Sequence, residues 1–134
     1  MKFLKFILLF IMFSIMTNAQ SIKSPNGNLE LTFALKSDGA PIYHLTYKNK
    51  DVIKESALGL ILKESGEMTS NFEIDKSETK SFDESWQPVW GEQKSIRNNY
   101  NELSVSLVQK EHGSRTLIIR FRLYDDGLGF RYEF

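Results

Sequence analysis

Short segments in which apolar and polar residues alternate recur along this chain, and this period of two constrains the fold more than any other feature. The clearest examples are Leu29–Leu35, Leu103–Val108 and Arg115–Tyr124. Alternation places every second side chain on the same side of an extended strand, so each segment can bury one face in a core. Residues that favour turns separate the segments, and no stretch combines a helical period with end caps. The sequence therefore predicts an all-β fold, an antiparallel sandwich or barrel formed by one domain or by part of one.

Weaker signals extend this pattern through the middle of the chain. Additional strands are expected at Ser21–Lys23, Ile42–Tyr47, Val52–Ile53, Leu58–Leu62 and Asn71–Phe82. The apolar run that ends at Leu62 is short enough to be a buried strand. The polar residues 64–70 are expected to form a loop, and residues 111–114 are expected to form the turn before the last two strands.

The last twenty residues predict a β-hairpin. Strand Arg115–Tyr124 leads into the turn residues Asp125–Gly127, and Leu128–Phe134 is the returning strand. Aspartate and glycine tolerate the backbone conformations that tight hairpin turns require. A pairing that keeps one face apolar sets these residues opposite each other: Leu123 and Phe130, Phe121 and Tyr132, Ile119 and Phe134, Arg120 and Glu133, Arg122 and Arg131.

This pairing places two like charges, Arg122 and Arg131, directly opposite each other, which destabilises a sheet by about 0.2–1 kcal/mol. One interpretation is that both arginines are solvated on an exposed face, where charges contribute little. The other interpretation is that a carboxylate from a part of the protein outside this sequence lies between them.

The chain stops at Phe134, an apolar residue in the middle of the last expected strand. Chain ends are usually polar and frayed. We therefore expect the sequence to be the opening piece of a longer protein. In that protein, Phe130, Tyr132 and Phe134 would face a sheet that this sequence does not supply.

Residues 1–19 have the features of a secretory signal peptide, which leaves residues 20–134 as a partial β-sandwich domain. Lys2 and Lys5 form a positive start, an apolar run follows, and small residues up to Ala19 predict cleavage before Gln20. The apolar run is too short to span a bilayer comfortably, so no membrane anchor is expected after cleavage. We expect an exported protein that resides in the bacterial periplasm or is secreted.

The charge and cysteine content of residues 20–134 exclude several classes of protein. These 115 residues carry 15 basic and 17 acidic side chains, a net charge of −2. Proteins that bind nucleic acid or an anionic membrane surface need a basic excess, so neither partner is expected. The chain has no cysteine, and an exported domain without disulfides must rely on an ordinary apolar core.

The sequence contains no recognisable catalytic or metal-binding motif. His44 and His112 have no second ligand at a suitable spacing. Asp125 and Asp126 are adjacent in a turn, where neighbouring side chains point apart. There is no glycine-rich phosphate loop and no nucleophile elbow. We expect no intrinsic active site and no cofactor in this chain.

The stretch from Trp86 to Leu103 is the richest in functional side chains. Aromatic faces stack on sugar rings, and amide, guanidinium and carboxylate groups bridge hydroxyls. We expect the stretch to lie largely on a loop, where binding residues often gather. The alternative is that its tryptophans fill the core. The candidates for carbohydrate binding or a domain interface are Trp86, Trp90, Glu92, Arg97, Asn98, Tyr100, Asn101 and Glu102.

Several motifs together resemble the N-terminal domain of glycoside hydrolase family 97. They occur in the order of the family and cover nearly all of Ser24–Phe134. The most specific are WGE followed by IRNNYNEL, and FRLYDDGLGFRYEF. The supporting motifs are SPNGNLELTF, APIYHLTYKNKDVI and LGLIL.

The resemblance implies an antiparallel β-super-sandwich, of which this chain is the opening portion, packed against a (β/α)₈ catalytic barrel. The parent would be an exported, calcium-dependent enzyme acting on α-glucosides or α-galactosides, with an α-linked oligosaccharide as substrate. The catalytic carboxylates and calcium ligands of the family match no position here, so the chain alone is expected to be inactive. The alternatives are a self-standing exported carbohydrate-binding module and a structural or interaction domain of the bacterial envelope.

Overall fold

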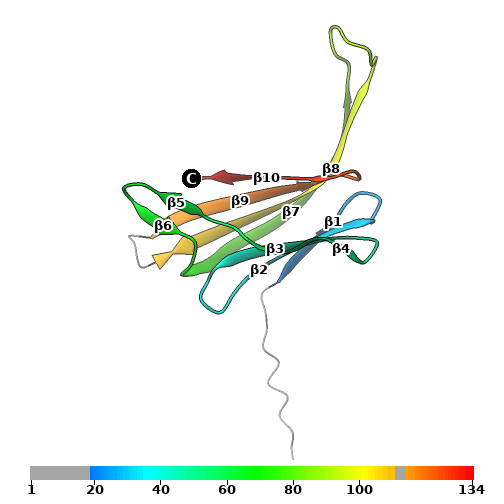
Figure 1. Cartoon of the computed structure of the whole chain (residues 1–134). Helices are drawn as coiled ribbons and strands as arrows, with labels where there is room; N and C mark the ends of the chain where they lie inside the picture. Colours follow the sequence, from blue (N-terminus) through cyan, green and yellow to red (C-terminus); the bar gives the residue numbers. More distant parts are fainter. Residues whose placement is uncertain (1–18, 111–113) are drawn as a thin grey trace, which may run out of the picture.

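The computed structural model describes residues 19–110 and 114–134, and within these residues it contains ten β-strands and no α-helix. Two four-stranded sheets lie face to face, one with the order β1-β2-β3-β4 and one with the order β10-β9-β8-β7 (Figure 1). A small third sheet pairs β5 with β6, and all pairings are antiparallel. The strands are β1 Gln20–Lys23, β2 Leu29–Leu35, β3 Pro41–Tyr47, β4 Lys50–Ala57, β5 Leu60–Leu62, β6 Gly66–Met68, β7 Phe72–Trp86, β8 Ile96–Gln109, β9 Arg115–Leu123 and β10 Leu128–Glu133.

The structure confirms the all-β antiparallel sandwich predicted from the alternating pattern. The proposed signal peptide falls almost wholly outside the described residues, and so does most of the expected turn at residues 111–114.

Alternation along β2, β8 and β9 forms the core between the two sheets. Leu31 and Phe33 point inward from one sheet and meet the inward side chains of the other, with the rings of Phe33 and Phe121 5.9 Å apart. Burying one such side chain stabilises the fold by about 1.5–3 kcal/mol. The fully buried residues of β8 and β9 are Leu103, Val105, Leu107, Leu117, Ile119, Phe121 and Leu123.

The segment before β7 differs from the prediction. Residues 64–70 were expected to form a loop, but β6 pairs there with β5, and Met68 is buried. The apolar run that includes β5 is not a buried strand, because Ile61 is 76% exposed. A two-stranded hairpin at the edge of the sandwich buries one face only, so a continuous apolar run does not imply burial on both faces.

The last hairpin has a different register from the one expected. Phe121 lies opposite Phe130 and Arg120 lies opposite Arg131, a shift of two residues from the predicted pairs. The loop is closed by a 2.8 Å hydrogen bond from the Tyr124 N–H to the Gly127 carbonyl. A shift of two residues leaves every side chain on the same face, so the apolar pattern could not distinguish the two registers.

The apolar face of β10 is covered in part by this chain itself. The rings of Phe130 and Tyr43 are 5.9 Å apart, and the Tyr132 hydroxyl accepts a 3.1 Å hydrogen bond from the Gly59 N–H. A side chain at position 59 would meet the Met68 carbonyl, which explains the glycine. The expectation that Tyr132 needs a sheet from elsewhere was therefore wrong, whereas Phe130 and Phe134 remain 43% and 79% exposed.

Strands β7 and β8 form a long hairpin, here called the ribbon, whose far end stands away from the sandwich (Figure 1). Because β8 begins at Ile96, the candidates Arg97 to Glu102 lie on a regular strand. The expectation of a loop holds only for residues 87–95, which connect the two strands. The alternating pattern is weak here because only one end of the ribbon faces the core.

Candidate functional site

The end of the ribbon, residues 86–96, is an exposed apolar surface, here called the ribbon tip. Trp86 is 53% exposed, Trp90 is 88% exposed and Val89 is fully exposed. The interpretation that the tryptophans fill the core is therefore wrong. The tip encloses an open depression lined by Trp86, Pro88, Trp90, Gly91, Glu92, Gln93 and Ile96. Its indole faces and one carboxylate suit either a sugar ring or the apolar surface of another domain.

Below the tip, Arg97 holds the two strands of the ribbon together. Its Nε and Nη2 donate to the two carboxylate oxygens of Asp83 at 2.8 and 2.7 Å. These hydrogen bonds hold the pKa of Asp83 below its ordinary value. Asn98 lies opposite Glu84 in the same ladder. Arg97 is therefore committed to an exposed ion pair within the ribbon.

Asn101 and Tyr100 lie where the ribbon joins the sandwich. The Asn101 side chain donates a 2.8 Å hydrogen bond to the Lys23 carbonyl, which links β8 to β1 of the other sheet. Tyr100 is buried on the outer face of its sheet, stacked on Phe82 with ring centroids 4.8 Å apart. Tyr124 packs against the other side of this cluster at 5.2 Å.

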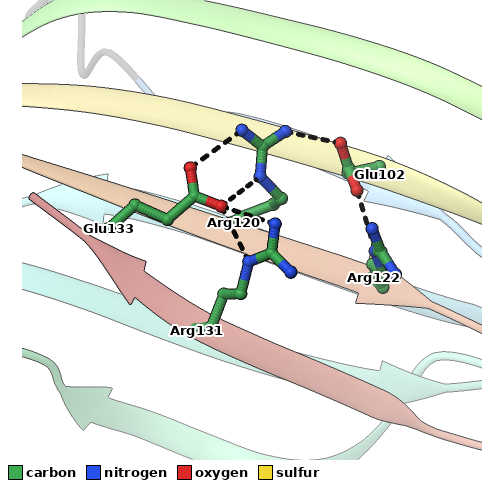
Figure 2. Close-up of polar contacts among 5 residues, drawn as sticks. All are labelled: Glu102, Arg120, Arg122, Arg131 and Glu133. Atoms are coloured by element: carbon green, nitrogen blue, oxygen red, sulfur yellow. Dashed lines mark hydrogen bonds and ion pairs between the residues drawn. The ribbon is translucent and has the colours of Figure 1, made fainter.

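Glu102 is the most buried member of an ion-pair network on the outer face of the β10-β9-β8-β7 sheet (Figure 2). It is only 4% exposed and accepts hydrogen bonds from Arg120 Nη1 at 2.7 Å and from Arg122 Nε at 2.8 Å. Arg120 also donates to both oxygens of Glu133 at 2.9 and 3.0 Å, and Arg131 Nε donates to Glu133 at 2.7 Å. We call these five residues the outer network.

The outer network shifts the pKa of each of its carboxyl groups downward. Burial raises the pKa of Glu102, but hydrogen bonds from Arg122 and Arg120 outweigh burial and lower it overall. Hydrogen bonds from Arg120 and then Arg131 lower the pKa of Glu133 to about 2. Both carboxylates are therefore ionised at neutral pH and act as fixed acceptors.

The eight candidates do not form one site. Trp86, Trp90 and Glu92 belong to the ribbon tip, whereas Tyr100 and Glu102 are buried further along the ribbon, opposite Phe82 and Lys80. Sequence reasoning missed the central role of Arg120 and did not bring Glu102 to the arginines of the last hairpin. The expected contact between Arg120 and Glu133 does form, although the two residues are diagonal rather than opposite.

The carboxylate expected from outside the sequence, between Arg122 and Arg131, has a partial counterpart within this chain. Glu102 binds Arg122 and Glu133 binds Arg131. No single carboxylate of the described residues bridges these two arginines. The outer network supplies one acceptor to each of them instead.

Among residues 19–110 and 114–134, no group of three or more histidine, aspartate or glutamate side chains is arranged to hold a metal ion. No helix in this part of the chain is long and apolar enough to cross a bilayer.

The chain is similar to several glycosidases. A family model described as Glycosyl-hydrolase 97 N-terminal matches residues 22–134. A retaining alpha-galactosidase from Bacteroides thetaiotaomicron is 25% identical over 135 residues, which cover 98% of this chain and 19% of the relative. A glycoside hydrolase family 97 enzyme from Pseudoalteromonas sp. strain K8, solved in complex with panose and with acarbose, has a TM-score of 0.80 and 33% identity over 85% of this chain and 17% of that chain.

A further solved structure, a beta-arabinopyranosidase, shares the fold with a TM-score of 0.74 at 24% identity. The chain spans less than a fifth of the length of all these relatives. The family model, in contrast, covers the sandwich from β1 to β10. The chain therefore belongs to the family of glycosyl-hydrolase 97 N-terminal domains.

Proposed function

We propose that this chain is the N-terminal sandwich of an exported family 97 glycosidase that acts on α-glucosides or α-galactosides, and that it packs on a catalytic barrel and supports it. The observation that carries the proposal is that the family model matches nearly the whole sandwich, whereas the sandwich covers less than a fifth of the length of the similar glycosidases. The named alpha-galactosidase and the complexes with panose and acarbose support an α-linked oligosaccharide as the substrate of the whole enzyme.

The carboxylates of the outer network support a structural rather than a catalytic role. Hydrolysis of a glycosidic bond needs a carboxylic acid with a raised pKa and a second carboxylate across the sugar. Glu102 and Glu133 both have lowered pKa values and are held by arginines. The acid, the second carboxylate and the calcium ligands would therefore come from the rest of the enzyme.

The ribbon tip is the surface that we assign to the barrel. A two-stranded hairpin is marginally stable in water by itself, and the tip adds Val89 and Trp90 with no apolar neighbour to cover them. Large exposed apolar groups gathered in one place usually mark an interface. Docking of the tip would bury both residues and fix the orientation of the ribbon.

The test compares the whole polypeptide, the same polypeptide without residues 20–134, and the isolated chain. The isolated chain should release no nitrophenol from nitrophenyl α-glucoside or α-galactoside. The whole polypeptide should hydrolyse one of them, and the deletion should lose activity and melt at a lower temperature. Turnover by the isolated chain, or a deletion with unchanged rate and melting temperature, would refute the proposal.

A carbohydrate-binding role for the isolated chain is the second candidate. The observation that favours it is the depression between Trp86 and Trp90, which has Glu92 and Gln93 on its rim. Titration of the labelled chain with maltotriose or an α-galactoside would show saturable shifts of the two indole N–H signals if the tip binds sugar. Unchanged indole signals would exclude sugar binding at the tip and leave docking as its remaining proposed role.

Export is also part of the proposal. Strand β1 begins at Gln20, directly after the expected cleavage site at Ala19, so removal of residues 1–19 would leave the sandwich whole. Mass spectrometry of the protein isolated from its host should find Gln20 at the N-terminus. A mature protein that retains Met1 would contradict export through this signal.

A further inference from the structure

The outer network carries more positive than negative charge. Three guanidinium groups, those of Arg120, Arg122 and Arg131, face two carboxylates, those of Glu102 and Glu133. Glu78 of β7, whose charge Arg120 also feels, is paired with Lys76 at 2.6 Å. One positive charge of the network therefore has no counter-charge among these residues.

That charge lies beside a pocket of about 190 Å³ at the end of the network. The pocket is lined by Arg120, Arg122, Tyr124, Gly129, Phe130 and Arg131, so its charged lining residues are all arginines. Arg122 and Arg131 flank it from neighbouring strands, as diagonal neighbours in the β9–β10 ladder. Diagonal neighbours in a sheet are about 7–8 Å apart, which leaves space between their side chains for a small anion.

The two flanking arginines retain free hydrogen-bond donors. Arg131 uses Nε and Nη2 for Glu133, and its third nitrogen has no carboxylate partner among the described residues; in Figure 2 this nitrogen points to the side on which Arg122 lies. Arg122 uses Nε for Glu102, interacts with the Tyr124 hydroxyl and lies over the Tyr100 ring at 4.7 Å. These contacts fix its orientation and leave further N–H groups of the guanidinium available.

Gly129 keeps the pocket open. It lies directly opposite Arg122, and its absent side chain would point to the same face as the arginines. A Cβ atom at this position would meet no heavy atom within 4 Å. The backbone there has no conformation that demands glycine. The turn therefore does not require glycine at this position, and the missing side chain leaves the space opposite Arg122 open.

We propose that Arg122, Arg131 and Gly129 form a binding site for one carboxylate group. A planar guanidinium fork matches the two oxygens of a carboxylate, and a single negative charge balances the single uncompensated positive charge. A phosphate, with nearly two negative charges, would exceed that balance. The proposal concerns this chain alone and does not depend on its role in a glycosidase.

The test is a titration of the isotope-labelled chain with sodium acetate at constant ionic strength, followed by the amide of Gly129 and the Nε–H signals of Arg122 and Arg131. These signals should shift and saturate. Arg131→Gln should weaken binding about tenfold, the effect of losing one charge-assisted hydrogen bond. Gly129→Val keeps every charge but fills the pocket, and it should abolish binding.

Lys110→Gln is the matched control, because it removes one positive charge from a residue paired with Glu73 at the other end of the sheet. It should leave acetate binding unchanged. The amide spectrum and melting temperature of each variant establish that it is folded. Shifts that do not saturate, undiminished binding in Arg131→Gln, or binding that persists in Gly129→Val would overturn the proposal.

A second titration, with glucuronate, distinguishes the source of the carboxylate. If the site takes a free acidic sugar, glucuronate should bind at least tenfold more tightly than acetate, because its hydroxyls add contacts. If the site takes the side chain of an aspartate or glutamate from another domain, the two ligands should bind equally, because only the carboxylate is recognised. Glucose, which has no charge, should not bind in either case.

Discussion

Two stretches of the β7–β8 ribbon, the part that joins the sandwich and the tip, lie in very different surroundings. At the sandwich end, Tyr100 and Glu102 are buried beneath arginines, and each has partners within the chain. At the tip, Trp86, Val89 and Trp90 are exposed. The difference indicates that the first stretch stabilises the sheet, and it supports the proposal that the tip is an interface.

The largest effect on stability is expected from removing the buried carboxylate of the outer network. Glu102→Gln leaves two arginines without their buried acceptor, and it should lower the free energy of unfolding by about 2–3 kcal/mol. Urea unfolding followed by far-ultraviolet circular dichroism measures this. A loss below about 0.5 kcal/mol would mean that the network adds little to stability.

Acid should weaken the sandwich end through the same carboxylates. The pKa of Glu133 falls from an ordinary 4.5 to about 2 in the folded chain, and the pKa of Glu102 is also lowered. A lowered folded-state pKa means that the stabilisation is complete above about pH 4.5 and is lost as the pH falls toward 2. Denaturant midpoints between pH 6 and pH 2 should decline in this range, and the decline should be smaller in Glu133→Gln.

Arg97 lies between the tip and the buried residues Tyr100 and Glu102. Its substitution tests whether this part of the ribbon has a structural or a functional role. Its ion pair with Asp83 is exposed, so Arg97→Ala should change the melting temperature little. If the ribbon shapes the sugar pocket of the whole enzyme, the same change should raise KM or lower kcat. A lower melting temperature with unchanged rate constants would assign Arg97 a structural role.

The smallest effect on stability is expected at the tip. The double change Trp86→Ala and Trp90→Ala removes side chains that bury little surface in this chain, so the free energy of unfolding should fall by about 0.5 kcal/mol or less. Urea unfolding of the isolated chain measures the change. A loss as large as that of Glu102→Gln would show that the tip folds back on the sandwich.

The sequence predicted the fold where alternation was strong and failed where it was weak. The core faces of β2, β8 and β9 follow directly from their period of two. Two errors have a common cause, because the hairpin at β5–β6 and the long ribbon each bury only part of their length. In strands that are only partly buried, apolar and polar stretches of the sequence do not indicate where the strand begins or ends.

The candidate site was predicted less well than the fold. The sequence indicated Trp86 and Glu102 together because they are close in the chain, but strand pairing places Trp86 at the tip and Glu102 further along the ribbon, opposite Lys80. Glu102 meets Arg120 and Arg122 through the β8–β9 ladder. That register depends on the whole sheet, and the apolar pattern alone does not distinguish shifts of two residues.

Oxidative footprinting of Trp90 tests the central claim, that the tip is an interface with the rest of a glycosidase. Hydroxyl radicals should oxidise Trp90 readily in the isolated chain, where it is 88% exposed. In the whole polypeptide its oxidation should fall at least tenfold, while the oxidation of an exposed residue of the other sheet, Val52 in β4, stays the same. Equal oxidation of Trp90 in the two proteins would contradict the claim.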